Sequence, residues 1–220
     1  MQYHHIGIPT DHLGSLSAYH PELGAHRTST EKSPFGISWL CFEEGSLAPE
    51  LLKSTPYIAF VVDDVDSARA GYSPILRFRD EEYGDAVFID VNGVPVLLMS
   101  SGGVNKADPS YVYHSFWVPT EQKRVSEVHL PDLKMFVENK ENKFAVGWVR
   151  YQQDAPYPQP VKRWPHLAFE VADMSEAIGS YPVLIAPNIP QDGLEVSFVE
   201  VNGIPVEFVS VDYEIHPNGV

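Results

Sequence analysis

The sequence predicts an α+β protein, mainly β, that is built from two similar halves. Two repeated windows support this prediction. The window Pro56–Val65 (PYIAFVVDDV) returns as Pro165–Met174 (PHLAFEVADM) with five identical residues in ten, and Val87–Ser100 returns as Ser197–Ser210 with seven in fourteen. Chance would give roughly one match in twenty positions. The offset is nearly the same for both windows, which indicates an internal duplication.

Two further windows extend the duplication toward the start of each half. His4–Thr10 matches His114–Thr120, and each ends in Pro-Thr. Phe35–Phe42 matches Phe144–Tyr151 in its apolar pattern and in its single Trp. The repeat therefore covers most of the chain.

The windows define two copies, residues 1–101 and residues 109–211. Residues 101–108 between them are small and polar, which is typical of a linker. Each copy is small for an independent core. We therefore expect the halves to pack as an internal pseudo-dimer, which would let the chain act as a monomer.

Each copy ends in a hairpin signal. In the first copy, the apolar runs Val87–Val91 and Val94–Met99 are joined by Asn92-Gly93. Asn-Gly favours a two-residue hairpin turn because both central residues need a positive φ. The second copy repeats this pattern between Ser197 and Val211.

A strand followed by a short helix precedes each hairpin. Asp64 and Asp173 follow the strand of the first repeated window and are placed to cap a helix of about two turns. Strand, helix, strand and terminal hairpin make a βαβββ-like unit. The segments Leu13–Leu23 and Val125–Val137 are compatible with either helix or strand.

Composition excludes several classes of partner. The net charge of −15 argues against nucleic acid and anionic membranes. Cys41 is the only cysteine, which excludes an intrachain disulfide and a cysteine-based zinc site. The sequence has no apolar stretch of membrane length. We therefore expect a soluble cytoplasmic protein.

The two copies differ most at three aligned positions. The second copy has ionisable side chains where the first has apolar or aromatic ones: His166, Glu170 and Glu207 replace Tyr57, Val61 and Leu97. Side chains alternate between the faces of a strand, so His166 and Glu170 share one face. Glu207 lies in a strand that is largely apolar on both faces.

A buried carboxylate in such a strand is costly unless it is paired, protonated or bound to a metal. His166 offers a neutral imidazole, and a second histidine would complete a set of two histidines and one carboxylate with Glu207. Fe(II), Zn(II), Ni(II), Mn(II) and Co(II) all suit this set, which leaves open positions for substrate.

The segments His5–Ile8, Pro165–Val171 and Val201–Val209 resemble the vicinal oxygen chelate superfamily. This superfamily includes glyoxalase I, extradiol dioxygenases, methylmalonyl-CoA epimerase and bleomycin- and fosfomycin-resistance proteins. The whole chain is similar to two short glyoxalase-like units in tandem. The resemblance implies paired βαβββ modules that curve into half-open barrels, with metal ligands on the inner strands.

Carried over by position, the resemblance implies a metal site in the second copy, with Gly147 where one acidic ligand is missing. The implied ligands are His114, His166 and Glu207. The first copy keeps at most one ligand, so its site is degenerate; the residues at the corresponding positions are His4 or His5, Ser38, Tyr57 and Leu97.

Modules of this superfamily pair within a copy or exchange between copies, and the third ligand depends on which occurs. Pairing within a copy gives His114 with His166 and Glu207. Exchange gives His5 or His4 with the same two residues. Alignment of the copies pairs His4 with His114, whereas the family pattern favours His5.

Three further residues differ in how their roles can be interpreted. Glu170 is a candidate general base, or a candidate hydrogen-bond acceptor for a metal-binding histidine, or it is merely solvated. Arg150, which replaces Cys41, is a candidate ligand for an anionic substrate group, or it forms a surface ion pair. Tyr57 is most simply a core aromatic residue that fills the lost site.

Two functions follow. The first is a metal-dependent enzyme that acts on a small oxygen-rich substrate, in which the metal chelates two adjacent oxygens and a carboxylate moves a proton. Lyase, isomerase, epimerase and dioxygenase share that step, so the reaction stays open. The alternative is a metal-free protein that binds a small molecule, as resistance proteins of this fold do.

Overall fold

The computed structural model describes residues 1–13, 17–28, 34–101, 111–138 and 141–215. The chain divides into two compact units, Met1–Asp108 and Pro109–Val220. The expected linker at 101–108 lies almost wholly outside the described residues. No described helix is long and apolar enough to span a membrane.

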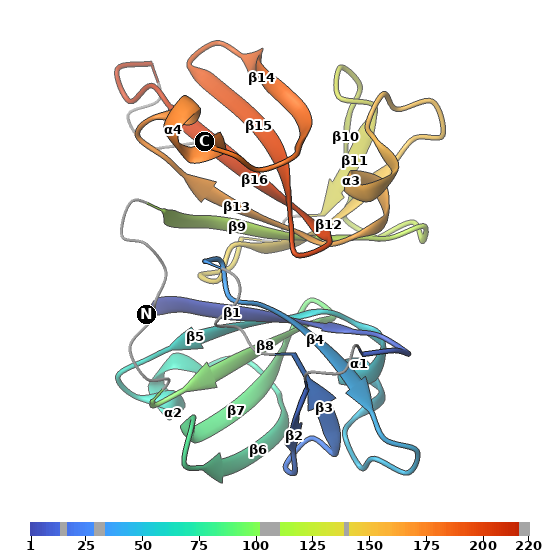
Figure 1. The fold of residues 1–220 in the computed structure, drawn as a ribbon, viewed down its shortest axis with the longest axis vertical. Coiled ribbons are helices and arrows are strands. Elements are labelled where there is room, and N and C mark those ends of the chain that lie inside the picture. Colours follow the sequence, from blue (N-terminus) through green and yellow to red (C-terminus); the bar gives the residue numbers. More distant parts are fainter. Residues whose placement is uncertain (14–16, 29–33, 102–110, 139–140, 216–220) are drawn as a thin grey trace. The chain divides into compact units, whose positions relative to one another are not determined.

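The first unit contains one eight-stranded sheet with the strand order β2-β3-β4-β1-β5-β8-β7-β6 and two short helices (Figure 1). The strands are β1 (Gln2–Pro9), β2 (Ala18–His20), β3 (Ala25–Arg27), β4 (Ile37–Phe42), β5 (Tyr57–Val61), β6 (Pro74–Asp80), β7 (Gly84–Val91) and β8 (Val94–Met99). The helices are α1 (Glu50–Ser54) and α2 (Val65–Ala68).

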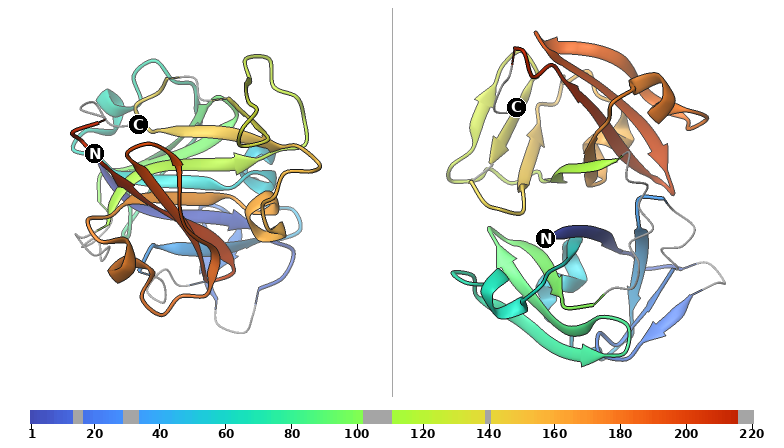
Figure 2. Two further views of the ribbon diagram at one scale, coloured as in Figure 1. Left: turned by 90° about the horizontal axis from the view of Figure 1, so that it is seen from above. Right: turned by 90° about the vertical axis from the view of Figure 1, so that its left-hand side faces the viewer.

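The second unit repeats this arrangement with the order β10-β11-β12-β9-β13-β16-β15-β14. The strands are β9 (Val112–Pro119), β10 (Val128–Leu130), β11 (Met135–Glu138), β12 (Val146–Tyr151), β13 (His166–Glu170), β14 (Val183–Gln191), β15 (Leu194–Val201) and β16 (Ile204–Val211). The helices are α3 (Gln159–Arg163) and α4 (Met174–Ile178). Each sheet curls around its concave face, as two further views show (Figure 2).

Each sheet consists of two four-stranded modules that meet at an antiparallel pair, β1–β5 or β9–β13. Within each module the first and last strands pair in parallel. Every strand of a sheet comes from one copy, so the modules pair within a copy. The predicted fold class, an α+β protein with two pseudo-symmetric half-barrels, is confirmed.

The local signals for hairpins and caps are also confirmed. Asn92 and Asn202 have φ values of 56° and 50°, as the tight hairpin turns require. The side chain of Asp64 accepts a hydrogen bond from the Ser67 N–H at 2.6 Å, which caps α2. Asp173 caps α4 in the same way.

The two ambiguous segments form short strand pairs, β2–β3 and β10–β11. A tight turn with a positive φ closes each pair, at Gly24 (55°) and at Lys134 (49°). In the described residues, only the second module of each unit has a helix between its first two strands, so only that module is a complete βαβββ unit.

Candidate functional site

The concave face of the second sheet surrounds a cavity of about 500 Å³. All eight strands of the sheet contribute to its wall. Most of the wall is apolar, and four aromatic residues line it: Trp117, Tyr151, Tyr157 and Phe198. This volume is typical of a site for a small molecule.

His166 and Glu207 lie together on this wall. β13 and β16 run parallel with Ala168 opposite Glu207, so His166, two residues earlier, faces the same side of the sheet. The Nε2 atom of His166 is 3.6 Å from Oε2 of Glu207. The imidazole also packs edge-on against Phe198, with the ring centroids 5.3 Å apart.

Burial makes both side chains neutral near pH 7. It lowers the pKa of His166 to about 3 and raises the pKa of Glu207 to about 8. Nδ1 of His166 is buried without a hydrogen-bond partner among the described residues. A cation bound between the two groups would favour the ionised form of Glu207.

Two donors at this separation suit a shared metal ion. If the metal lay about 2.1 Å from both atoms, the 3.6 Å separation would correspond to an angle of about 120° at the metal, near the tetrahedral value. Over the described ranges, however, no three His, Cys, Asp or Glu side chains are grouped closely enough to hold a metal. The structure brings His166 and Glu207 together but does not bring in a third protein ligand.

His114 lies on the cavity wall, half-buried, at a bulge of β9. Burial lowers its pKa, and the negative charge of Glu170 partly opposes that shift. Ser115, not His114, is paired with Ala168. The register therefore leaves His114 at the bulge, places Trp117 opposite His166, and gives Ser115 the position opposite Ala168.

His5 has the corresponding place in the first unit, where it is paired with Ala59. It is fully buried, and its Nε2 atom lies 3.1 Å from the Tyr57 hydroxyl. Its Nδ1 atom is 2.7 Å from Nδ1 of His4. Because the modules pair within a copy, the set expected after exchange, His5 or His4 with His166 and Glu207, is not assembled in either sheet.

Trp117 leaves no room for a side chain at Gly147, the position where the resemblance implies an acidic ligand. The two residues are paired across β9 and β12. A Cβ atom on Gly147 would lie 2.6 Å from Cζ3 of Trp117 and 2.9 Å from the Glu138 carbonyl oxygen. The indole N–H donates to Oγ of Ser115 at 3.0 Å, which fixes the ring. The indole thus occupies space that a ligand side chain at Gly147 would need.

Trp117 is not among the residues that the sequence pattern singles out, although the aligned copies carry the signal. Gly7 is opposite Ser38 in the first unit, and Trp117 is opposite Gly147 in the second. In the first unit the larger residue of this facing pair lies on β4, and in the second unit it lies on β9. A comparison of facing residues, rather than of single positions, would have identified the wall residue.

Arg150 is not placed to bind substrate in the cavity. Its guanidinium pairs with Glu127, with Nε 3.1 Å from Oε2, and lies 4.0 Å from the centroid of the Phe136 ring. Val149 and Tyr151 line the cavity, so the alternation of β12 turns Arg150 to the other face. The ion pair, rather than the anion-binding role, is what the structure shows.

Glu170 also lies outside the cavity wall. The Tyr213 hydroxyl is 2.8 Å from both of its carboxylate oxygens and donates a hydrogen bond to it. β13 and β9 shift register just before Glu170, between Ala168 and Phe169. The structure therefore does not bring this candidate base to the His166–Glu207 pair.

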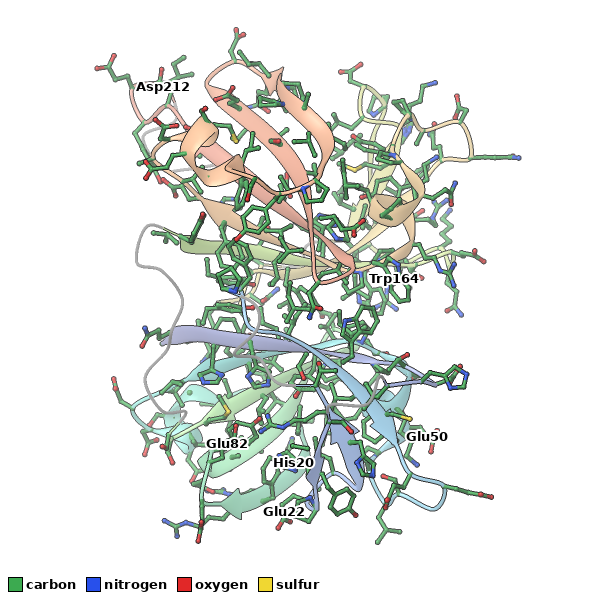
Figure 3. All side chains as sticks on the ribbon, in the orientation of Figure 1. His20, Glu22, Glu50, Glu82, Trp164 and Asp212 are labelled. Carbon is green, nitrogen blue, oxygen red and sulfur yellow. The ribbon has the colours of Figure 1, made fainter. Side chains whose placement is uncertain are left out.

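The first unit fills its concave face with side chains. Tyr57, Phe88 and Leu97 belong to one buried cluster, and the Tyr57 ring meets Phe88 edge-on at 5.0 Å. His20 lies in the first unit (Figure 3), and its ring stacks on Tyr83, which belongs to the same cluster. Tyr57 therefore fills the position that His166 has in the second unit, as the sequence predicts.

No family model matches the chain, and no curated protein matches it. Among solved structures, a mutant of 4-hydroxymandelate synthase from Streptomyces coelicolor is similar, with a TM-score of 0.50 and 14% identity over 96% of this chain and 92% of that one. At such identity the likeness concerns the fold alone.

Two weaker similarities are with a xylose isomerase-like TIM barrel/4-hydroxyphenylpyruvate dioxygenase fusion protein and with methylmalonyl-CoA epimerase from Mycobacterium tuberculosis. Their identities are 10% and 11%, and they cover 90% and 73% of this chain and 44% and 89% of theirs. Their TM-scores, 0.43 and 0.27, are too low to support an argument. The repeat, the two eight-stranded half-barrels and the likeness to the synthase over the whole chain show that this protein has the paired half-barrel fold that its resemblance to the vicinal oxygen chelate superfamily implies.

Proposed function

We propose that the second unit is the site of a metal-dependent enzyme that acts on a small oxygen-rich substrate. The buried His166–Glu207 pair on the wall of the cavity carries this proposal. Divalent Fe, Zn, Ni, Mn and Co all suit an imidazole and a carboxylate. When bound, such an ion supplies Lewis-acid polarisation of two adjacent substrate oxygens.

The residues of the chain have separate roles in this proposal. His166 and Glu207 hold the cation, and the positive charge would keep Glu207 ionised despite its burial. His114, on the same wall, is the proposed third ligand, and it would reach the pair through a movement of the bulged part of β9. The aromatic wall orients the substrate and excludes water. Lyase, isomerase, epimerase and dioxygenase reactions are all compatible with this arrangement.

A second candidate function is binding of a small molecule without a metal. The absence of a third ligand near His166 and Glu207, within the part of the chain that the structure describes, favours this candidate. The largely apolar wall also suits a protein that only sequesters its ligand. Against it stands the energetic penalty of burying a carboxyl group beside an imidazole without using either.

Metal analysis separates the two functions. We expect tag-free protein to contain a transition metal or to take up Fe(II), Ni(II) or Zn(II), with a rise in melting temperature because the ion binds only the folded state. Glu207→Gln should weaken metal affinity at least tenfold, since it removes the anionic ligand at nearly constant shape. Tyr57→Phe, at the position equivalent to His166, is the matched control and should leave affinity unchanged.

Two results would contradict the proposal. If the parent protein neither contains a metal nor takes one up, metal-free binding becomes the better function. If Tyr57→Phe abolishes uptake while Glu207→Gln preserves it, the site lies in the other copy.

A further inference from the structure

We infer that the cavity of the second unit selects a substrate with an uncharged, aromatic body. This inference rests on the proposed function for the reacting end of the substrate and deepens it by naming the class of the remainder. Two independent features support it, namely the charge of the wall and the rings that form it.

The wall has no cation to hold an anionic substrate body. Among the described residues that line the cavity, none is Lys or Arg. Arg124 and Arg150, on neighbouring segments, instead pair with Glu138 and Glu127. An anionic body would lose its hydration in the cavity and gain no ion pair, whereas an uncharged body has no such penalty.

The first unit shows that a cation is compatible with this frame. Arg27 is paired with Leu40, and the aligned residues Val137 and Val149 are paired in the second unit. Arg27 lies largely buried, with an ion pair to Glu82. The second copy has valine at the same place, and that valine lines the cavity.

Four rings from separate segments form flat, rigid walls. Trp117 is held by its bond to Ser115, and the rings of Tyr151 and Tyr157 are 5.0 Å apart. Phe198 is held against His166. Aromatic rings bind other rings more favourably than they bind saturated groups of the same size, because stacked and edge-on geometries are favoured. The site therefore suits a planar ring system.

The test measures calorimetric affinity of metal-free, full-length protein for three probes: 2-naphthol, 2-naphthyl phosphate and the saturated alcohol 2-decalol. We expect 2-naphthol to bind at least tenfold more tightly than 2-naphthyl phosphate and at least threefold more tightly than 2-decalol. Trp117→Leu keeps the wall apolar but removes one of the four rings, so it should lower the ratio of 2-naphthol affinity to 2-decalol affinity below that of the parent protein.

Val137→Arg tests the charge argument directly. It should shift the preference toward 2-naphthyl phosphate at least tenfold, because it places a cation where the first unit has Arg27. Val128→Arg adds the same charge at an exposed position outside the cavity wall and should leave the preference unchanged. If Val137→Arg does not fold, the probe affinities of the parent protein and of Trp117→Leu still decide the matter.

The inference is overturned if the parent protein binds 2-naphthyl phosphate as tightly as 2-naphthol, if it binds no probe, or if both arginine variants shift the preference equally. Failure of the proposed function has a different signature. It appears as absent metal uptake in a separate titration, while the probe preferences, measured without metal, persist.

Discussion

The two units have one sheet topology but fill their concave faces in opposite ways. The first uses Tyr57 and Leu97 as part of a packed apolar cluster. The second has His166 and Glu207 at the aligned positions and keeps a cavity of about 500 Å³ beside them. A duplicated chain can thus keep one copy optimised for packing while the other carries ionisable groups that burial destabilises.

The same contrast appears in the row of facing residues beside this position. In the first unit a Cβ atom on Gly7 would lie 2.2 Å from Cε1 of Tyr57, so the tyrosine ring covers the glycine. In the second unit Trp117 covers Gly147. Each row has one large ring over one glycine, but the ring stands on a different strand. In the second unit the position aligned with Tyr57 carries His166, which lines the cavity together with Trp117.

Exchanging the aligned residues Leu97 and Glu207, on the last strand of each unit, should give the largest effect on stability. Leu97→Glu puts a carboxyl group into a fully buried apolar cluster, and we expect it to lower the free energy of unfolding by about 4 kcal/mol. Glu207→Leu removes a buried ionisable group and should leave the metal-free protein equally or more stable. Urea denaturation at pH 7 measures both. Equal losses for the two variants would mean that the interiors do not differ as described.

The pH dependence of stability should reveal Glu207. Its pKa is raised by burial to about 8 in the folded state, so its contribution to stability is fully present below about pH 4.5 and is lost as the pH rises through 8. Measured relative to Glu207→Gln, the metal-free parent should lose on the order of 3 kcal/mol between pH 5 and pH 8; this difference removes the opposing contribution of His166, whose lowered pKa costs stability toward acid in both proteins. Glu207→Gln should remove this loss.

Urea midpoints at several pH values, with a chelator present, measure this dependence. Saturating metal should also suppress the loss in the parent protein, because the bound cation favours ionised Glu207. Identical pH profiles for the parent and Glu207→Gln would exclude a strongly perturbed carboxyl group at this site.

Adding one methyl group to either covered glycine should cost about 2 kcal/mol. Gly7→Ala clashes with the Tyr57 ring and with Cδ1 of Leu40, so the nearest atoms are side-chain carbons. Gly147→Ala also meets the Glu138 carbonyl oxygen at 2.9 Å, and backbone moves less easily than a side chain.

Double variants sharpen this comparison. The stability cost of Gly7→Ala should be smaller in a Tyr57→Ala background than in the parent protein, because the ring that the new methyl group meets is then absent. The stability cost of Gly147→Ala should fall less in a Trp117→Ala background, because the contact with the Glu138 carbonyl oxygen remains. Thermal unfolding of the single and double variants measures both couplings. A larger rescue at Gly147 would show that the ring, not the backbone, dominates there.

The sequence predicted the fold because its signals are local and occur twice. Asn-Gly turns and Asp caps act within a few residues, and the repeat places them in the same order in both halves. The strand pair β10–β11 was not predicted, because a turn with Lys134 at positive φ has no strong residue signature.

The candidate site was only partly predictable for a related reason. Alignment of the two copies was enough to single out His166 and Glu207, because it compares residues at equivalent positions and shows ionisable side chains where the first copy has Tyr57 and Leu97. The bulge that sets Ser115 rather than His114 opposite Ala168 depends on pairing between distant strands. The Arg150–Glu127 ion pair joins residues 23 positions apart, and no pattern in the sequence predicts such a partner.

The smallest expected effect concerns the hydroxyl that distinguishes Tyr57 from an ordinary core ring. Tyr57→Phe keeps the ring over Gly7 but removes the hydrogen bond to Nε2 of His5, leaving that buried nitrogen without its partner. We expect a loss of about 1 kcal/mol. Tyr19→Phe, which removes an exposed hydroxyl bonded to Glu43, is the matched control and should change stability by less than about 0.5 kcal/mol.

Hydrogen exchange would locate the effect of Tyr57→Phe. Amides of β1 and β5, which hold His5 and Tyr57, should exchange faster, while those of β9 and β13 should keep the parent rates. Metal uptake should be unchanged, because the hydroxyl belongs to the unit without the carboxyl group. Faster exchange in β13, or a loss of metal uptake, would show that the division between a packed copy and a binding copy is incomplete.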